Sequence, residues 1–216
     1  MVIDMKKMAF IDMEGVLIPE IWKHFANILN IPELSITTRE VPNYKQLMSH
    51  RINILKDKNI ALNTLVEMIH EVEVFYGAKD FLNFLQTDKQ FEIKIISNCF
   101  HEFLDPFFEK LNFPVQNTYC HTLRVGENGL IENVNYSRDK GKHEIIVKYQ
   151  KEKVSLKNSI AIGDAFNDFT MLHLVDHGFL FKASEEVKKN SPFYFHKVQS
   201  YQDILNYLNS RKIIEF

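Results

Sequence analysis

Three short apolar segments of the sequence each end in a polar residue whose side chain can do chemistry. The segments 8–12, 93–97 and 159–164 end in Asp12, Ser97 and Asp164. One strand that ends in Asp is common, because Asp opens turns and caps helices. Three such endings indicate more, because the carboxyl ends of parallel strands meet at one edge of a sheet, where ligands bind.

A second acid, Glu14, follows Asp12 in the sequence Phe-Ile-Asp-Met-Glu-Gly. A carboxylate at position 12 can attack phosphorus, and Glu14 can protonate the leaving oxygen and later deprotonate the attacking water. That role requires the pKa of the Glu14 carboxyl to be raised by burial or by a hydrogen-bond partner. We therefore predict Asp12 and Glu14 as a catalytic pair.

Ser97, Asn98 and Lys142 are candidates for binding a phosphate. The hydroxyl of Ser97 and the backbone N–H of Asn98, expected at the start of a helix, offer donors to phosphate oxygens. A Ser at that place is more often a plain helix cap. Lys142, at the start of another predicted helix, can neutralise a phosphoryl group, although the neighbouring Lys140 competes for the assignment.

Asp164 and Asp168 follow a buried segment and a Gly-Asp turn. Their carboxylate oxygens suit Mg²⁺, a hard ion that keeps some of its bound waters and also coordinates substrate phosphate. The histidines His173 and His177 are four residues apart, but Gly178 ends the helix there and no third ligand follows. A zinc site is therefore not expected.

The elements that must position these residues alternate along the chain. Strands are predicted at 8–12, 93–97, 159–164 and 178–181, and helices at 78–85, 101–111, 142–151, 166–174 and 201–208. Strand followed by helix, repeated, predicts an α/β fold with a doubly wound parallel sheet, similar to the Rossmann fold. A weakly alternating stretch at 119–136 around Glu127-Asn128-Gly129 predicts an additional β-hairpin.

Residues 16–75 interrupt that alternation, because three amphipathic stretches and no strand are found there. The stretches cover 20–30, 43–57 and a third that begins at a capping box of Thr64 and Glu67. We predict a small helical domain at 16–75, inserted after the first strand of a core formed by 1–15 and 76–216.

Composition restricts the classes of function. The 216 residues include 26 Lys and Arg and 28 Asp and Glu, for a net charge of −2, which argues against a broad grip on nucleic acid or an acidic membrane. The basic segment 138–157 is typical of a solvated helix face. Two cysteines and the lack of an apolar membrane span predict a cytoplasmic protein. Neither GxGxxG nor GxxxxGK occurs, so a phosphomonoester is expected instead of ATP.

Taken together, the four motifs resemble those of the haloacid dehalogenase superfamily of Mg²⁺-dependent phosphatases, in the same order and over essentially the whole chain. The resemblance implies an aspartyl-phosphate intermediate on Asp12 and Glu14 as general acid and base. It also implies Mg²⁺ held by Asp12, the backbone carbonyl of Glu14 and Asp164, with Asp168 supporting the metal from behind.

A narrower resemblance is to the phosphoserine phosphatase branch, and within it to bifunctional phosphoserine phosphatase/homoserine phosphotransferases. It is carried by DMEGVLIPEIW, TTREVPNYKQLMSHRINIL, GAKDFLNFL and GDAFNDFTML. It implies that the helical insertion is a cap, and that Glu20 binds the substrate ammonium, Arg51 its carboxylate and Asn167 the bound phosphoserine. The chain departs from the branch after Ser97, where Asn98-Cys99 replaces the usual Gly-Gly or Asp-Thr.

Several alternatives remain open at this point. The same chemistry fits a different small phosphomonoester, and homoserine could replace water as the phosphoryl acceptor. A receiver-like regulatory domain also carries a phosphorylated aspartate on a parallel sheet, but it needs neither a helical cap nor a second acid at Glu14. The expected partner is a small-molecule substrate, with no nucleic acid and no membrane, and the expected state is a monomer or homodimer.

Overall fold

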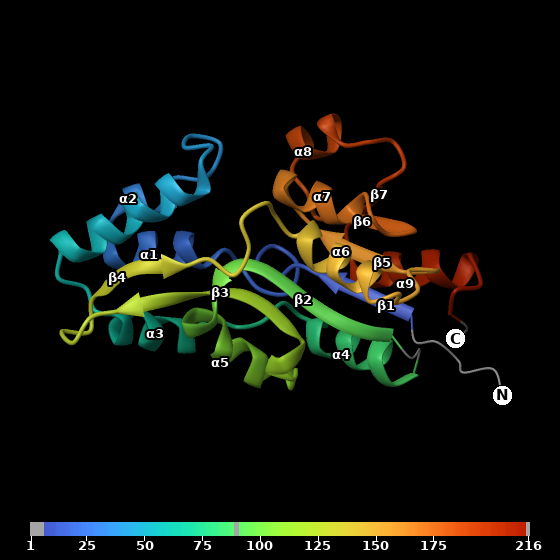
Figure 1. Ribbon diagram of the computed structural model, residues 1–216, viewed down its shortest axis with the longest axis horizontal. Coiled ribbons are helices and arrows are strands. Elements are labelled where there is room, and N and C mark those ends of the chain that lie inside the picture. The colour runs from blue at the N-terminus through green and yellow to red at the C-terminus, as the bar shows by residue number, and fades with distance from the viewer. Residues whose placement is uncertain (1–6, 89–90, 215–216) are drawn as a thin grey trace.

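A computed structural model describes residues 7–88 and 91–214 of the chain. In these ranges seven strands form one sheet in the order β4-β3-β2-β1-β5-β6-β7 (Figure 1). The strands are β1 (Lys7–Ile11), β2 (Phe91–Phe100), β3 (Thr118–Val125), β4 (Ile131–Asn135), β5 (Ile160–Gly163), β6 (His177–Phe181) and β7 (His196–Val198). Every pairing is parallel except that of β3 with β4.

The helices of the described ranges connect these strands. They are α1 (Ile21–Leu29), α2 (Tyr44–Asp57), α3 (Leu62–His70), α4 (Ala78–Asn83), α5 (His101–Leu111), α6 (His143–Lys151), α7 (Phe169–Leu172), α8 (Glu185–Asn190) and α9 (Tyr201–Ser210). Shorter helical turns are η1 (Pro32–Ser35), η2 (Phe84–Asp88), η3 (Val115–Asn117) and η4 (Phe166–Asp168).

Alternation along β1 gives the sheet two buried faces. Ala9 and Ile11 belong to the core cluster that includes buried residues of α4, α5 and α9. Met8 and Phe10 belong to a second cluster with buried residues of α6, α7 and α8. Because successive side chains of a strand point to opposite faces, one apolar strand can serve both layers. The predicted doubly wound α/β fold is therefore confirmed.

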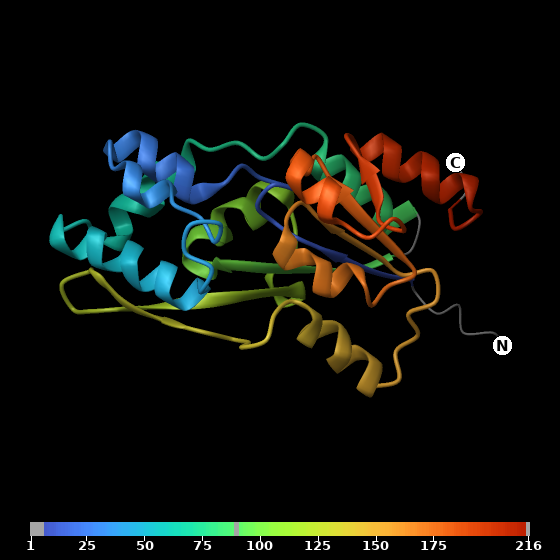
Figure 2. The same ribbon diagram turned by 90° about the horizontal axis from the view of Figure 1, so that it is seen from above.

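The helices α1, α2 and α3 lie between β1 and β2 in the sequence and gather at one end of the molecule (Figure 2). Phe25 of α1 packs edge to face against Phe103 of α5, with ring centroids 5.2 Å apart. The backbone N–H of Leu62 donates to the carbonyl of Gly129 at the tip of the β3–β4 hairpin, 2.9 Å away. The helical insertion and the hairpin are thus confirmed, and the domain boundaries at 15/16 and 75/76 stay a prediction.

Three local expectations were wrong. Helix α3 begins at Leu62 with Ala61 as its N-cap, so Thr64 lies inside the helix and caps nothing. The stretch 166–174 divides into η4 and the short α7. The sequence 93–97 is only the middle of β2, which continues to Phe100 because Cys99 and Phe100 are buried apolar residues that extend the strand.

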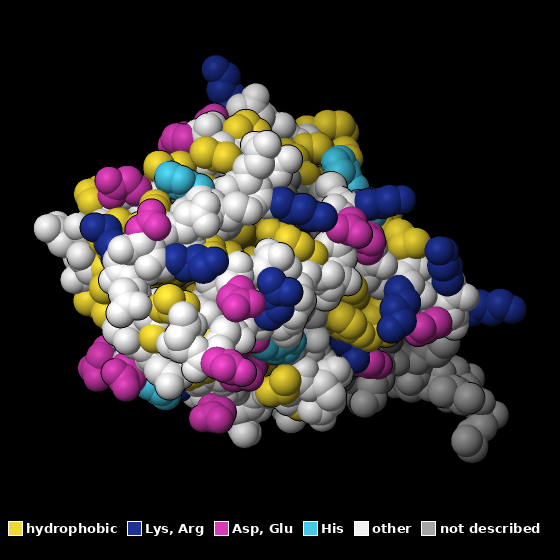
Figure 3. Space-filling model, turned by 60° about the vertical axis from the view of Figure 1, so that its left-hand side comes forward, with side chains coloured by type: hydrophobic (Ala, Val, Ile, Leu, Met, Phe, Trp, Pro, Cys, Tyr) yellow, Lys and Arg dark blue, Asp and Glu magenta, His cyan; other side chains and the backbone are white. Residues whose placement is uncertain are grey.

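The surface carries both signs of charge. Figure 3 shows basic and acidic side chains interspersed over the face turned to the viewer, as the near-balanced composition leads one to expect. Among the described residues, no helix combines the length and the apolar character that crossing a membrane requires.

Candidate active site

The sheet register brings Asp12 and Asp164 to the same edge. Ile11, the last residue of β1, lies opposite Ile95 of β2 and Ile162 of β5. The backbone N–H of Asp12 extends the ladder by donating to the carbonyl of Ile162 at 2.9 Å. The two aspartates therefore follow the carboxyl ends of neighbouring parallel strands, which is where an open α/β sheet binds its ligands.

Lys142 joins two of the predicted site aspartates. Its Nζ lies 2.5 Å from Oδ1 of Asp12 and 2.6 Å from Oδ1 of Asp168, and its side chain is 1% exposed. Burial by itself would lower the pKa of Lys142, but the two carboxylates outweigh it and raise that pKa. Lys142 is thus a buried ammonium held charged by two acids, and its place directly before α6 confirms the predicted helix start.

Asp12, Asp164 and Asp168 form what we call the carboxylate cluster, with one oxygen of each lying within 4.8 Å of the others. Burial and the charge of Asp168 raise the pKa of Asp12 to about 7, and the same two causes raise that of Asp164 to about 9. Like charges this close, with one lysine to balance them, favour binding of a further cation. An all-oxygen donor set fits Mg²⁺.

The backbone around Asp164 is fixed by Asp168. Oδ2 of Asp168 accepts hydrogen bonds from the N–H groups of Asp164 at 2.9 Å and Ala165 at 3.1 Å. Its other oxygen contacts Lys142, so this fully buried carboxylate has a partner on each side. Asp168 therefore ties the loop after β5 to Lys142.

Glu14 lies where the chain turns from β1 into the helical insertion. Its Oε1 accepts a hydrogen bond of 2.8 Å from the N–H of Ile21, the first residue of α1. Burial, followed by the charge of Glu20, raises the pKa of the Glu14 carboxyl to about 7. A carboxyl that titrates near neutrality can both donate and accept a proton, as general acid–base chemistry requires.

The Ser97–Asn98 segment is built differently from the expectation. Ser97 is buried, and its Oγ accepts a hydrogen bond from the N–H of Cys99 at 3.1 Å. Asn98 is not at a helix start, because β2 continues to Phe100 and α5 begins at His101. Backbone donors at this point come from an irregular strand end.

Arg51, on α2, is a buried guanidinium that forms no ion pair with the acids of the described ranges. Its NH2 group donates to the carbonyl of Ile36 at 2.6 Å, and its Cζ lies 4.6 Å from the centroid of the Trp22 ring. Its Nε is buried and has no hydrogen-bond partner, and no salt bridge to Arg51 is found in residues 7–88 and 91–214. A carboxylate brought by a ligand would supply the missing acceptor.

Glu20 and Asn167 are more exposed than the other candidates. Glu20 is the residue before α1, and its Oε1 lies 4.0 Å from Nζ of Lys23. Asn167 is exposed in η4, directly before Asp168. The structure thus joins Asp12, Asp168 and Lys142 by direct contact. Glu20 and Asn167 make no side-chain hydrogen bond or ion pair with these three residues in the described ranges.

Two residues in contact with the Ser97–Asn98 segment were missed by the sequence analysis. Arg138 donates through NH2 to the carbonyl of Ser97 and, at 2.8 Å, to Oδ1 of Asn98. The hydroxyl of Tyr44, on α2, donates to the carbonyl of Asn98. Arg138 was assigned to a solvated basic face, and Tyr44 carried no signal in its local sequence.

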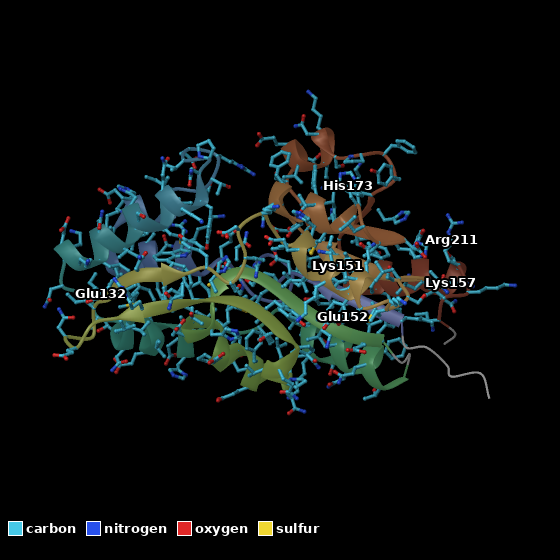
Figure 4. The ribbon with its side chains drawn as sticks, in the orientation of Figure 1. Glu132, Lys151, Glu152, Lys157, His173 and Arg211 are labelled. Atoms are coloured by element: carbon cyan, nitrogen blue, oxygen red, sulfur yellow. The ribbon has the colours of Figure 1, made fainter. Side chains whose placement is uncertain are left out.

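The histidine pair weighed for zinc is engaged elsewhere. His173, labelled in Figure 4, pairs through Nδ1 with the hydroxyl of Tyr194 at 2.7 Å. His177, on β6, pairs through Nδ1 with the hydroxyl of Tyr207 at 3.2 Å. In the part of the chain that the structure describes, the carboxylate cluster is the one group of three or more potential metal ligands.

A doubly wound parallel sheet with a helical insertion after β1, and a lysine in contact with two acids at its carboxyl edge, is the architecture of a class of α/β hydrolases. The chain belongs to the haloacid dehalogenase-like hydrolase family, whose model matches residues 3–208. The protein is therefore a phosphatase of this superfamily.

Named relatives support the same assignment. The chain is 33% identical over 198 residues to phosphoserine phosphatase ThrH of Pseudomonas aeruginosa, covering 92% of this chain and 93% of the relative. It is 33% identical over 186 residues to a phosphoserine phosphatase of Pseudomonas syringae pv. tomato, covering 86% and 76%. A solved structure of a phospho-aspartyl intermediate analogue of phosphoserine phosphatase superimposes with a TM-score of 0.78 at 20% identity, covering 94% and 99%, which shows the shared fold.

Proposed function

We propose that this protein is a Mg²⁺-dependent phosphatase of O-phosphoserine that works through an aspartyl-phosphate on Asp12. The observation that carries the proposal is the contact of Lys142 with both Asp12 and Asp168 inside the carboxylate cluster. The 33% identity to two phosphoserine phosphatases over most of the chain supports the substrate.

In the proposed first step the Asp12 carboxylate attacks phosphorus, and the bond from phosphorus to the serine oxygen breaks. Glu14, whose pKa is raised to about 7, gives its proton to that oxygen. In the second step Glu14 takes a proton from water, and the water oxygen attacks phosphorus and releases phosphate from Asp12. Each carboxylate then regains its starting state.

Charge neutralisation completes the proposed chemistry. Asp12, the backbone carbonyl of Glu14 and Asp164 would hold Mg²⁺, with Asp168 supporting it, and the bound ion would neutralise the phosphoryl oxygens. Lys142 supplies a fixed positive charge beside the nucleophile. These positive charges favour attack at phosphorus, because they stabilise the negative charge of the phosphoryl oxygens in the transition state.

Recognition of phosphoserine is assigned to the remaining candidates. Ser97 and the N–H of Asn98 would bind phosphate oxygens together with Lys142. Arg51, which lacks an acidic partner among the described residues, would bind the substrate carboxylate, and Glu20 would bind the ammonium. Residues 16–75 would act as the cap that excludes water during the first step.

Asn167 would contact the bound phosphoserine from η4.

Homoserine is a second candidate for the phosphoryl acceptor, besides water. Transfer to homoserine uses the same aspartyl-phosphate and differs only in whether an amino acid or water takes the phosphoryl group. The substrate is in either case a small phosphomonoester, and the expected oligomeric state is still a monomer or homodimer.

The experiment is phosphate release from phosphoserine, phosphothreonine and simple sugar phosphates, with Mg²⁺ or with a chelator, and with or without homoserine. We expect Mg²⁺-dependent hydrolysis of phosphoserine that Asp12→Asn abolishes. Phosphohomoserine in the products would establish transfer. Activity on another phosphomonoester with none on phosphoserine would reject the substrate, and turnover that survives Asp12→Asn would reject the nucleophile.

A further inference from the structure

The end of β2 that carries Ser97 is not held by a regular ladder. Ile96 lies opposite Tyr119 of β3, and Phe100 lies opposite His121, so the register shifts between the two pairs. Ser97, Asn98 and Cys99 therefore lie opposite a single residue of β3, Cys120. An interruption of this kind frees backbone groups from their strand partners and re-aims side chains.

Side chains from outside the two strands take over the freed carbonyls. The carbonyl of Ser97 accepts from NH2 of Arg138, and the carbonyl of Asn98 accepts from the hydroxyl of Tyr44. NH1 of Arg138 donates to the carbonyl of Tyr119 at 3.0 Å and to Oγ of Ser137 at 3.4 Å. Arg138 thus connects β2 to β3 at the point where their own pairing is interrupted.

Arg138 forms no salt bridge within the described part of the chain. The residue is 7% exposed, and in the described ranges no acidic oxygen lies within the salt-bridge distance of its guanidinium. A buried guanidinium without a charged partner costs stability, so the role of Arg138 is to be sought in what its hydrogen bonds position. Its planar fork can serve NH1 and NH2 partners together, which a lysine ammonium cannot do.

We propose that Arg138 is a positioning residue that holds Ser97 and Asn98 in the geometry needed to bind the phosphate. This inference rests on the proposed function, because it assigns the Ser97–Asn98 segment to phosphate binding. Arg138 acts through that segment: it fixes the Ser97 carbonyl and the Asn98 side chain, and so directs the Ser97 hydroxyl and the Asn98 N–H.

The test compares Arg138→Ala, Arg138→Lys and a control, Arg124→Gln. Arg124 lies on β3 of the β3–β4 hairpin and pairs with Glu132, 3.1 Å away, but its side chain is 61% exposed. Glu132 lies near the outer end of the hairpin in Figure 4. We measure kcat and KM for phosphoserine, the affinity for inorganic phosphate and the melting temperature of each variant.

Arg138→Ala is expected to lower kcat/KM by about 100-fold, the scale of a misplacement of about 1 Å in a reacting group. It should weaken inorganic phosphate binding, and free guanidinium should restore part of the activity. Arg138→Lys should lower kcat/KM by about tenfold, because an ammonium cannot donate to all the acceptors that the guanidinium reaches. This variant provides the test if Arg138→Ala does not fold. The kcat/KM of Arg124→Gln should stay within about twofold of the wild-type value.

A double-mutant cycle with Ser97→Ala separates positioning from a direct effect on the phosphoryl group. If Arg138 acts through Ser97, the penalty of Arg138→Ala should shrink at least about threefold in the Ser97→Ala background. Equal penalties in both backgrounds would overturn the inference, as would unchanged phosphate affinity in Arg138→Ala and Arg138→Lys. A wild type that does not hydrolyse phosphoserine would reject the proposed function alone, because phosphate binding by the same variants still tests Arg138.

Discussion

Gly15 lies directly against the carboxylate of Asp164, so close that a β-carbon on the glycine would stand 2.4 Å from Cγ of the aspartate. The glycine also has a φ of 77°, in the left-handed region that side chains disfavour. The turn after β1 therefore needs glycine for two independent reasons. A glycine at this position allows the loop after Asp12 to pack against the loop after β5.

Gly15→Ala is expected to displace Asp164 and to disturb the carboxylate cluster. The left-handed conformation alone costs about 1–2 kcal/mol for a residue with a β-carbon, and the displaced carboxylate should lower kcat by about 100-fold. Melting curves and Mg²⁺-dependent phosphate release measure the two effects. Gly126→Ala is the control, because there a β-carbon would meet side-chain ends outside the carboxylate cluster, Oε1 of Glu132 at 2.8 Å and Oδ1 of Asn128 at 3.0 Å. A Gly15→Ala enzyme with normal kcat would contradict this account.

Lys142→Met removes the ammonium between Asp12 and Asp168 and should lower kcat by about 100- to 1000-fold, the loss seen when one preorganised donor to a developing charge is removed. The matched control is Lys140→Met, because Lys140 is exposed and only two residues away. Steady-state kinetics on phosphoserine will distinguish them. If the two variants lost activity equally, the assignment of Lys142 by geometry would be wrong.

The pH dependence of stability should reveal the carboxylate cluster in the metal-free protein. The pKa of Asp12 is raised from 3.8 to about 7 and that of Asp164 to about 9, by burial and by Asp168. Between the unshifted pKa of 3.8 and the raised values, the folded protein keeps protons that the unfolded chain has released. The free energy of unfolding should therefore fall as pH rises from about 4 to 9. The melting temperature in chelator should therefore be lower at about pH 8 than at about pH 6.

Added Mg²⁺ should reverse that trend. An ion bound to the ionised carboxylates would displace their protons, so Mg²⁺ should raise the melting temperature more at about pH 8 than at about pH 6. Asp164→Asn serves as the control, because it removes the acid with the larger shift and should flatten the pH dependence of the metal-free protein. A stabilisation by Mg²⁺ that is the same at both pH values would count against a metal in this cluster.

Arg51→Gln is expected to raise KM for phosphoserine by about 10- to 100-fold, since a hydrogen bond to a charged group contributes about 1.5–3 kcal/mol. A phosphomonoester without a carboxylate should be affected much less. Arg51→Lys keeps the positive charge but loses the planar fork, so its KM should lie between those of the wild type and the glutamine variant. Equal losses on both substrates would show that Arg51 supports the cap and does not read the carboxylate.

The parts of the site that could be predicted from the sequence are those in which the signal is local. Apolar runs that end in Asp12 and Asp164 locate β1 and β5 to within a residue, and the helix expected at 101–111 is α5. These features depend on residues near each other in the chain. Lys142 was predicted as a site residue from its place at a helix start, and its contact with Asp12, 130 residues away, is a finding of the structure.

The parts that could not be predicted depend on pairing between distant segments. The register shift between β2 and β3 is set by how two strands meet, and nothing in the sequence around Ser97 marks it. Arg138 lies in a run with seven basic residues against three acids in 138–157, where spacing is typical of a solvated face. Burial of this one arginine follows from the interrupted ladder that it joins.

Tyr44 connects the helical insertion to the Ser97–Asn98 segment, for which we propose phosphate binding, because its hydroxyl donates to the carbonyl of Asn98. The next residue, Lys45, makes a second connection to the loop before Lys142, with Nζ 2.8 Å from Oδ1 of Asp139. The two bonds differ in their surroundings: the Tyr44 bond is part-buried, whereas the side chains of Lys45 and Asp139 are 57% and 75% exposed. The part-buried Tyr44 bond should therefore contribute more to holding the helical insertion against the core than the exposed Lys45 ion pair.

Tyr44→Phe is expected to lower kcat/KM for phosphoserine by about 2- to 10-fold, the equivalent of one net hydrogen bond, and to leave the Asn98 carbonyl with one donor fewer. Lys45→Gln should change kcat/KM by less than about twofold, because an exposed ion pair is screened by water and salt. Measuring both variants at low and high ionic strength separates the two bonds: only the small effect of Lys45→Gln should vanish with salt. If Tyr44→Phe matched the wild type while Lys45→Gln impaired turnover, the cap would be held by its exposed ion pair and not by the bond to the phosphate-binding segment.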